Sequence, residues 1–302
     1  MTRATLVRWL KRLVIAVVVL IATILFIVLP LGGSFLITNA RFQMRERGPQ
    51  TPSEVGLTVT SVEFYSSDGV SLRGWWTPGQ ASKAVIIFCH GLNRSRLELM
   101  ERAAEASRAG YGVLLFDFRG HGQSGTAYRT LGIHEMKDVC AAGQAVRDRA
   151  ANRPQVLWGV SMGASTALLA AQRCKPFKAV VADSSFLSFR ETISHHVKLF
   201  FGLPSFPFAN LIIGITKMRM GMNPDDGDVE ASVRQMNDVP ILFIAGTADR
   251  RMPPELAERL KRASNNPKSE LLIVPDATHG EAYSKNKALY MNAVFAFLDR
   301  AL

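Results

Sequence analysis

The sequence predicts an α/β fold, in which a mostly parallel sheet carries helices on both faces and one N-terminal helix crosses a membrane. Two observations support the sheet. Short apolar runs alternate with segments of helical periodicity, and the runs are continuously apolar, as strands covered on both faces are. A third observation supports the membrane helix, because 19 consecutive residues near the N-terminus, 13–31, carry no charge.

The composition is that of a globular protein, with 302 residues, 48% of them hydrophobic and 20% charged. These values exclude a disordered or collagen-like chain. The formal net charge is +11, but residues 1–47 contribute +6 of it, from seven basic residues against Glu46. Basic residues beside a long apolar run fit anionic lipid head groups better than a nucleic-acid groove, so we expect no nucleic-acid partner.

The N-terminal segment, residues 1–40, is predicted to be an uncleaved single-pass anchor whose residues 13–31 contact membrane lipids. About 20 apolar residues cross a bilayer, and a core helix would have a polar face. The alternative is a cleaved signal peptide, since Thr38, Asn39 and Ala40 resemble a cleavage site, but signal peptides have shorter apolar stretches. The flanking cations favour a cytoplasmic N-terminus and a domain on the extracytoplasmic side. They are Arg3, Arg8, Lys11 and Arg12 before the run and Arg41, Arg45 and Arg47 after it.

A linker rich in Gly and Pro is expected over residues 41–56, followed by a globular domain over residues 57–302. The domain begins with a hairpin, because the partly alternating segments 57–65 and 70–76 flank a turn cluster. Further strands are expected at 84–89, 112–116, 155–158, 179–182, 241–245 and 271–274. Helices are expected at about 95–109, 134–150, 161–173, 253–263 and 281–300.

The alternation stops between Ala182 and Pro240, although a simple crossover needs only about a dozen residues. We expect residues 184–238 to form a helical cap insertion over the site. Its aromatic side chains either form an apolar channel or membrane-facing lid, or pack the cap onto the domain. They are Phe186, Phe189, Phe200, Phe201, Phe206 and Phe208.

Three polar side chains follow strands at their carboxyl ends, where such sheets bind ligands. Ser161 lies in the G-V-S-M-G segment 159–163 between a strand and a helix, the G-x-S-x-G pattern of a nucleophile on a sharp turn. Asp249 and His279 follow the last two strands. Because a serine hydroxyl is a weak nucleophile, His279 is the candidate base and Asp249 the residue that orients it.

A fourth strand end supplies candidate oxyanion donors. His90 and Gly91 follow the strand at 84–89, and the flexible Gly91 lets the next backbone amide point at the nucleophile. The N–H groups of Leu92 and Met162 are therefore the predicted oxyanion hole. His90 is interpreted as structural, because one general base suffices.

Neither a cofactor nor a metal ion is predicted. No G-x-G-x-x-G loop follows the first strand, and no cluster of His, Asp or Glu has the spacing of metal ligands. Cys89, Cys140 and Cys174 lie far apart without C-x-x-C spacing, so we expect buried thiols rather than a disulfide framework.

Together these motifs resemble the α/β-hydrolase superfamily over residues 57–302. The resemblance rests on the G-x-S-x-G pattern, on the chain order Ser161, Asp249, His279, and on the His90-Gly91 pair. The D-F-R-G-H-G-Q-S segment at 117–124 is similar to that of the serine aminopeptidase-like and monoacylglycerol lipase-like branch. The resemblance implies a structural role for this segment and a membrane-bound serine hydrolase.

We therefore expect an enzyme that cleaves a carboxylic ester or thioester of an apolar acyl group through an acyl-enzyme. Its substrate would be a small-molecule or lipid-like acyl compound. A serine aminopeptidase is the first alternative, because Asp225 and Asp226 near the cap could bind an amino terminus. A catalytically silent binding module on the same fold is the second, and the complete set of Ser161, Asp249 and His279 argues against it.

Overall fold

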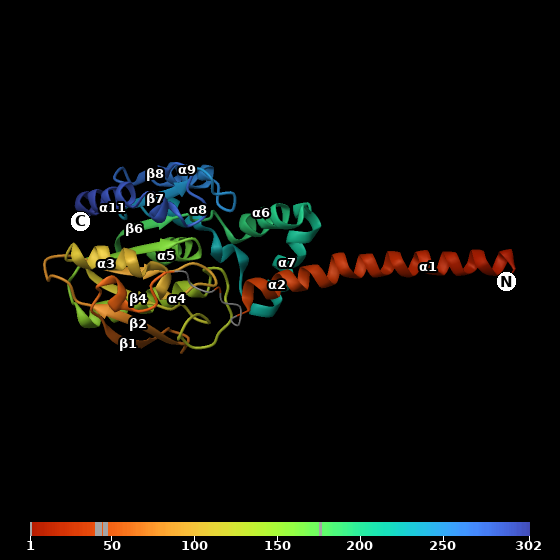
Figure 1. The fold of residues 1–302 in the computed structure, drawn as a ribbon, viewed down its shortest axis with the longest axis horizontal. Coiled ribbons are helices and arrows are strands. Elements are labelled where there is room, and N and C mark those ends of the chain that lie inside the picture. The colour runs from red at the N-terminus through yellow and green to blue at the C-terminus, as the bar shows by residue number, and fades with distance from the viewer. Residues whose placement is uncertain (1, 40–43, 45–47, 175–176) are drawn as a thin grey trace.

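The computed structural model describes residues 2–39, 44, 48–174 and 177–302, as a domain built on one sheet and a long N-terminal helix that projects from it (Figure 1). Within these residues the sheet has eight strands in the order β1-β2-β4-β3-β5-β6-β7-β8. β2 is antiparallel to β1 and β4, and the other neighbours are parallel, which confirms the predicted fold class. The strands are β1 (Thr60–Tyr65), β2 (Ser71–Thr77), β3 (Val85–Cys89), β4 (Gly112–Phe116), β5 (Gln155–Val160), β6 (Phe177–Asp183), β7 (Ile241–Gly246) and β8 (Glu270–Val274).

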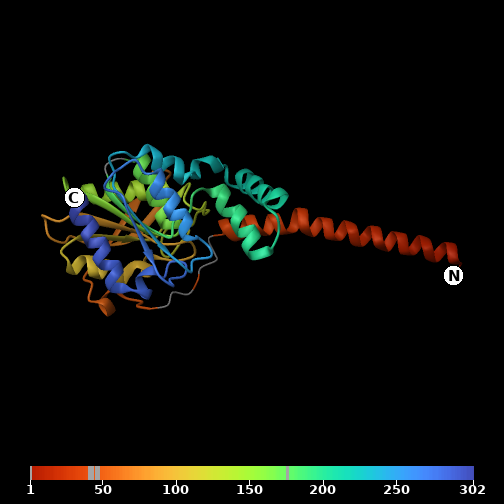
Figure 2. The ribbon, with the colours of Figure 1, turned by 90° about the horizontal axis from the view of Figure 1, so that it is seen from above.

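Helices on both faces explain why the central strands are continuously apolar. Every residue of β3, β4, β5 and β7 is buried, whereas the hairpin strand β2 alternates between buried and more exposed positions. The two layers of helices are visible in Figure 2. One face carries α3 (Met100–Arg108), α10 (Ala282–Lys285) and α11 (Lys287–Ala301). The other carries α4 (Glu135–Arg149), α5 (Met162–Arg173), α8 (Val229–Gln235) and α9 (Pro254–Ala263).

The chain between β6 and β7 forms a helical insertion. Its helices α6 (Phe189–Phe201) and α7 (Ser205–Met220) pack on each other and reach from the domain toward the N-terminal helix (Figures 1 and 2). The phenylalanines of the insertion divide into two groups. Phe186 and Phe189 are buried against the domain and Phe208 is buried against the N-terminal helix, whereas Phe200, Phe201 and Phe206 are exposed. Packing therefore accounts for only half of them.

The N-terminal helix is continuous and is made of α1 (Arg3–Thr23), the π-helical turn η1 (Ile24–Val28) and α2 (Leu29–Thr38). The π-helical turn comes just before Pro30, whose ring and missing N–H disturb the hydrogen-bond ladder of the turn before it. The helix is long and apolar enough to cross a membrane, as an anchor or as a signal sequence. None of the residues of α1 is buried.

The last ten residues of this helix pack against the insertion. Ser34 and Thr38 of α2 are fully buried, although both are polar. The Ser34 hydroxyl is 2.9 Å from the Thr216 hydroxyl of α7, and Arg219 donates to Ser34 Oγ at 2.7 Å and to Thr38 Oγ1 at 3.2 Å. Because buried hydroxyls need partners, these bonds make α2 part of the packed structure.

Part of the predicted linker also folds against the domain. Pro52–Val55 forms a 3-10 turn, η2, which Thr51 and Glu54 cap by reciprocal hydrogen bonds. Arg108 of α3 donates to the carbonyl of Val55 at 3.2 Å. The rest of the predicted anchor–linker junction, at 40–43 and 45–47, lies outside the described residues.

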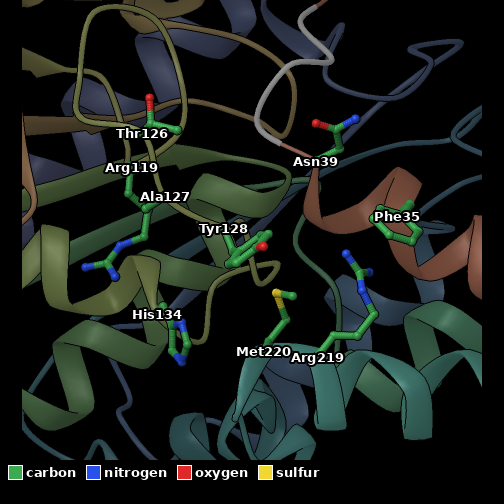
Figure 3. A pocket seen from close by; sticks show the side chains of 9 residues that line it. All are labelled: Phe35, Asn39, Arg119, Thr126, Ala127, Tyr128, His134, Arg219 and Met220. Atoms are coloured by element: carbon green, nitrogen blue, oxygen red, sulfur yellow. The ribbon is translucent and has the colours of Figure 1, made fainter.

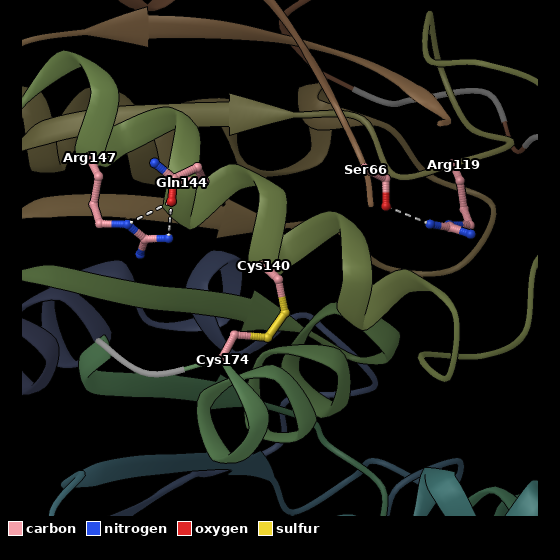
Figure 4. Close-up of a disulfide and its surroundings, with 6 residues drawn as sticks. All are labelled: Ser66, Arg119, Cys140, Gln144, Arg147 and Cys174. Carbon is pink, nitrogen blue, oxygen red and sulfur yellow. Dashed lines mark hydrogen bonds between the residues drawn. A yellow bond between two sulfur atoms is a disulfide. The ribbon is translucent and has the colours of Figure 1, made fainter. Parts of the chain in front are cut away.

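Cys140 and Cys174 form a disulfide that joins α4 to the end of α5 (Figure 4). Their Cα atoms are 5.6 Å apart, within the usual range. The prediction of buried thiols is therefore wrong for this pair and correct for Cys89, which is free and buried. A separation of 34 residues has no characteristic spacing. The pairing depends on how α4 packs on α5, which local pattern does not reveal.

Candidate active site

Ser161 occupies the tight turn between β5 and α5, with φ at 55° and ψ at −120°. Residues with a side chain rarely adopt this conformation, which projects the hydroxyl alone from the end of the sheet. The two flanking glycines are required by close packing. A Cβ atom on Gly159 would overlap the backbone of Gly163, and one on Gly163 would overlap the carbonyl groups of Cys89 and His90.

His279 and Asp249 reach Ser161 from the loops after β8 and β7. These loops are neighbours because β7 and β8 pair in parallel register up to Gly246 and Val274. His279 Nε2 is 2.8 Å from Ser161 Oγ, and His279 Nδ1 is 2.8 Å from Asp249 Oδ2. The structure thus brings the three predicted residues into one hydrogen-bonded chain with the imidazole at its centre. This order allows the imidazole to take a proton from the serine.

Asp249 is buried but carries a negative charge that its neighbours stabilise. Its Oδ1 accepts the backbone N–H groups of Arg251 at 2.9 Å and Met252 at 2.8 Å, which leaves Oδ2 for His279. Burial alone would raise the pKa of Asp249, but the bonds from His279 and these two amides hold the pKa below its ordinary value of 3.8. The carboxylate therefore fixes the His279 tautomer that carries its proton on Nδ1.

The two predicted oxyanion donors lie on segments that touch each other. Leu92 follows the end of β3, Met162 begins α5, and the contact of Gly163 with Cys89 and His90 holds these segments together. Among the described residues, neither the Leu92 nor the Met162 N–H donates a hydrogen bond. Glu98 supports the turn before Leu92 by accepting the N–H of Gly91 at 2.6 Å.

His90 lies beneath the site and is fully buried, as a structural role requires. Its Nε2 accepts the N–H of Phe118 at 3.0 Å, and its Nδ1 donates to the carbonyl of Gly91. The 117–124 segment is held in the same way, because Asp117 accepts the N–H groups of Arg96 and Gln123. These contacts support the loop beside the site without involving Ser161.

Two further groups lie near the relay, the hydrogen-bonded chain of Ser161, His279 and Asp249. Local sequence patterns did not indicate a role for either of them. Arg251 lies at the surface, and its guanidinium interacts electrostatically with Asp249 and Arg94, with partial desolvation lowering its pKa. His196 of α6 interacts with Arg251 and His279, and burial lowers its pKa to about 4. Its Nε2 is buried and has no hydrogen-bond partner among the described residues.

The two aspartates that favoured an amino-terminus site are already paired. Asp225 forms an ion pair of 2.6 Å with Arg190, and Asp226 forms one of 3.4 Å with Arg173. Both carboxylates lie on the exposed 3-10 turn η4 (Pro224–Gly227). The cations that satisfy them reduce their ability to bind a substrate ammonium group.

A hollow of about 710 Å³ lies where the N-terminal helix meets the domain (Figure 3). It lies between the ends of α2 and α7 and a loop of the domain, and none of the three relay residues lines it. Its walls are Phe35, Asn39, Arg119, Thr126, Ala127, Tyr128, His134, Arg219 and Met220. Within the described part of the chain no group of three or more His, Cys, Asp or Glu could hold a metal ion.

Two family models match the chain. The model described as serine aminopeptidase, S33, matches residues 80–232, which is half of the chain and includes the turn of Ser161. The model described as TAP-like protein matches residues 222–301, which include Asp249 and His279. The two matches together cover all three residues of the relay.

The chain is also similar to individual proteins. The chain is 29% identical to the uncharacterized protein YqkD of Bacillus subtilis, over 80% of each chain. It is 32% identical to the thiohydrolase aneE of Aspergillus aculeatus, over 44% of each chain. Its fold matches the esterase Pf2001 of Pyrococcus furiosus with a TM-score of 0.70 and 27% identity, over 86% of this chain and 99% of the other. The protein is thus a hydrolase of the α/β fold.

Proposed function

The chain belongs to the serine aminopeptidase S33 family, and we propose that within it this protein is a membrane-anchored serine esterase. Its substrates would be carboxylic esters or thioesters of an apolar acyl group, hydrolysed through an acyl-enzyme. The observation that carries this proposal is the hydrogen-bonded chain from Ser161 through His279 to Asp249, with 2.8 Å at each step. The similarity to an esterase and to a thiohydrolase supports the ester and thioester class.

In the proposed reaction Ser161 Oγ attacks the acyl carbon while His279 Nε2 takes the hydroxyl proton. The carbonyl oxygen becomes an oxyanion, which accepts hydrogen bonds from the N–H groups of Leu92 and Met162. The tetrahedral intermediate then expels the alkoxide or thiolate, which takes the proton from His279. Water, deprotonated by His279, attacks the acyl-enzyme and releases the carboxylic acid and Ser161.

The packing of the N-terminal helix on α7 supports its retention as an anchor. Residues 29–38 of the helix pack on α7 through the buried hydroxyls of Ser34 and Thr38. Cleavage after Ala40 would remove this segment and the two hydroxyls to which Arg219 of α7 donates. We therefore propose an uncleaved anchor over residues 1–40 with the hydrolase domain on the extracytoplasmic side.

Aminopeptidase activity is the second candidate, favoured by the description of the family model. A substrate ammonium group needs a free carboxylate near the relay. Instead Asp225 and Asp226 are paired with arginines, and the cation Arg251 lies near Asp249. This charge distribution favours a neutral or anionic acyl substrate.

The first experiment is fluorophosphonate labelling of the full chain in detergent micelles. The wild-type protein should be labelled at one serine, and Ser161→Ala and His279→Ala should lose the label because no activated serine remains. Ser284→Ala, which changes an exposed serine of α10, is the matched control and should keep it. Labelling that persists in Ser161→Ala contradicts the assignment, and a folded protein that is never labelled supports the silent module.

A substrate panel then separates the activities. We expect turnover of p-nitrophenyl esters and acyl thioesters to exceed that of aminoacyl amides in the wild-type protein. Asp249→Asn should lower kcat by about 10⁴, because the imidazole loses the partner that fixes its tautomer. Faster release of aminoacyl amides than of esters would establish the peptidase instead.

A further inference from the structure

The tip of the insertion, residues 200–206, includes the end of α6, the connecting turn and the start of α7. It is apolar and exposed. Residues 199–216 include no charged side chain, so the tip and most of α7 are uncharged. The exposed fractions are 59% for Phe200, 53% for Phe201 and 77% for Phe206. Three large aromatic side chains on one short segment form a patch of the kind that marks an interaction site.

The tip lies beside the N-terminal helix, and α7 runs parallel to it. Near the start of α7, the ring of Phe208 stacks on Phe26 at 5.7 Å between centroids. At the end of α7, Arg219 bonds to Thr38. Residues 208–219 of α7 thus run alongside residues 26–38 of the N-terminal helix in the same direction.

The length of the apolar run places the tip at a definite depth. At a rise of about 1.5 Å per residue, residues 13–31 span about 28 Å, close to the hydrocarbon thickness of about 30 Å. Residues 13–23 are free of the domain and cover only about 16 Å of this distance. The remaining 12 Å or so must be covered by residues 24–31, which lie next to the start of α7.

We propose that the tip, residues 200–206, inserts into the hydrocarbon of the bilayer beside the anchor. The inference rests on the proposed function, because it requires the N-terminal helix to cross the membrane. Phe206 then lies several ångströms inside the hydrocarbon, a depth that apolar faces of interfacial segments reach. Arg219, which bonds to Ser34 and Thr38, lies beyond Leu31 at the level of the lipid head groups, where cations are favourable.

The insertion also connects the bilayer to the active site. His196 of α6 interacts electrostatically with His279, and its ring lies 5.2 Å from the ring of Phe200, one helical turn further on. The helix α6 therefore extends from the tip toward the relay. This arrangement fits acyl esters that reside in the bilayer and approach the serine from the side of α6.

The test measures depth with a fluorophore. Cys89 is buried and the other two cysteines form a disulfide, so a single added cysteine can be labelled selectively with an environment-sensitive nitrobenzoxadiazole dye. Phe206→Cys is compared with Tyr65→Cys on the exposed strand β1 and with Val18→Cys in the apolar run. The full chain is reconstituted in vesicles of phosphatidylcholine and phosphatidylglycerol that carry spin-labelled acyl chains.

We expect position 206 to be quenched by the spin-labelled lipid and to be at least about threefold less sensitive to aqueous iodide than position 65. If iodide quenches the dye at position 206 as strongly as at position 65, while the spin-labelled lipid quenches the dye at position 18, the tip does not insert. The N-terminal helix then still crosses the membrane. Protection from both quenchers at 206 means that protein covers the tip and also overturns it. Absence of lipid quenching at 18 refutes the anchor itself, and the inference with it.

A second experiment measures ester hydrolysis by a triple variant that combines Phe200→Ser, Phe201→Ser and Phe206→Ser. The control is Met218→Ser, which changes an exposed apolar side chain outside the tip. The triple variant should raise KM for an ester embedded in vesicles severalfold and leave kcat/KM for a water-soluble short-chain ester unchanged. An equal loss on both substrates would indicate a folding defect of the cap and would contradict the membrane role.

Discussion

Two imidazoles beneath the relay, His90 and His121, are neutral because of the groups they face. The Nε2 atom of each accepts a backbone N–H, from Phe118 at 3.0 Å and from Asn93 at 3.3 Å. Their Nδ1 atoms must therefore donate to carbonyl groups, which the structure provides at 2.8 Å. Burial lowers the pKa of both, that of His121 to about 2. A proton on either Nε2 would face an N–H group that it cannot bond.

These histidines predict a loss of stability in mild acid. Their folded pKa values lie below the unfolded value of about 6.5, so the stabilisation is complete above pH 6.5 and decreases as the pH falls below it. Each histidine contributes up to about 1.4 kcal/mol per pH unit of acidification. Thermal unfolding of the full chain in detergent between pH 7.5 and 5 measures the slope. His121→Gln should lower stability at pH 7.5 and flatten the slope, whereas His195→Gln in the cap should keep it.

The relay residues were predictable from sequence because each directly follows a strand that is recognisable by itself. Arg219 was not predictable. Its partner Ser34 is 185 residues away, and neither residue lies in a motif. The same holds for His196, whose position depends on how α6 lies relative to the sheet. Local pattern reveals a side chain's role only where one element determines its position.

At the scale of elements, the contact between α2 and α7 depends on one of two adjacent glycines. A Cβ atom on Gly33 would lie 2.9 Å from Ile212 Cδ1, whereas one on Gly32 would meet nothing within 4 Å. Gly33→Leu should therefore separate the helices and destabilise the protein by about 1–3 kcal/mol, the usual cost of overpacking. Gly32→Leu, which adds the same side chain one residue earlier, should have little effect.

Limited proteolysis of the α6–α7 segment and the midpoint of thermal unfolding measure this difference. Combining Gly33→Leu with Ile212→Ala should restore part of the loss, since the smaller side chain makes room. Equal effects at Gly32 and Gly33 would show that α2 does not dock on α7 in the membrane.

Strands and helices differed in how well their patterns predicted them. Burial on both faces leaves a continuous apolar run, so the central strands were predictable almost to the residue. The insertion was predictable as helical but not in its placement. An apolar side chain such as Phe206 has the same pattern whether it faces lipid or a protein core, and only its exposure beside a membrane helix distinguishes the two.

For the whole molecule, charge and cysteine chemistry agree on orientation. Four cations precede the apolar run and three follow it, which favours a cytoplasmic N-terminus. The disulfide between Cys140 and Cys174 independently favours an oxidising compartment for the domain, because cytosolic thiols stay reduced. The two arguments share no residue, so one experiment that reports the compartment tests both.

Counting thiols in the membrane-bound protein provides that experiment. Cells that express the full chain are trapped in acid, unfolded and treated with a polymer-linked maleimide. We expect one modified cysteine, Cys89, before reduction and three after it, because the disulfide closes only on the oxidising side. Cys140→Ser should free the thiol of Cys174 and give two modified cysteines without reduction. Because the crosslink is lost, the variant's free energy of unfolding should fall by about 2–4 kcal/mol. Three reactive thiols without reduction would place the domain in the cytoplasm, with the anchor inserted in the opposite direction.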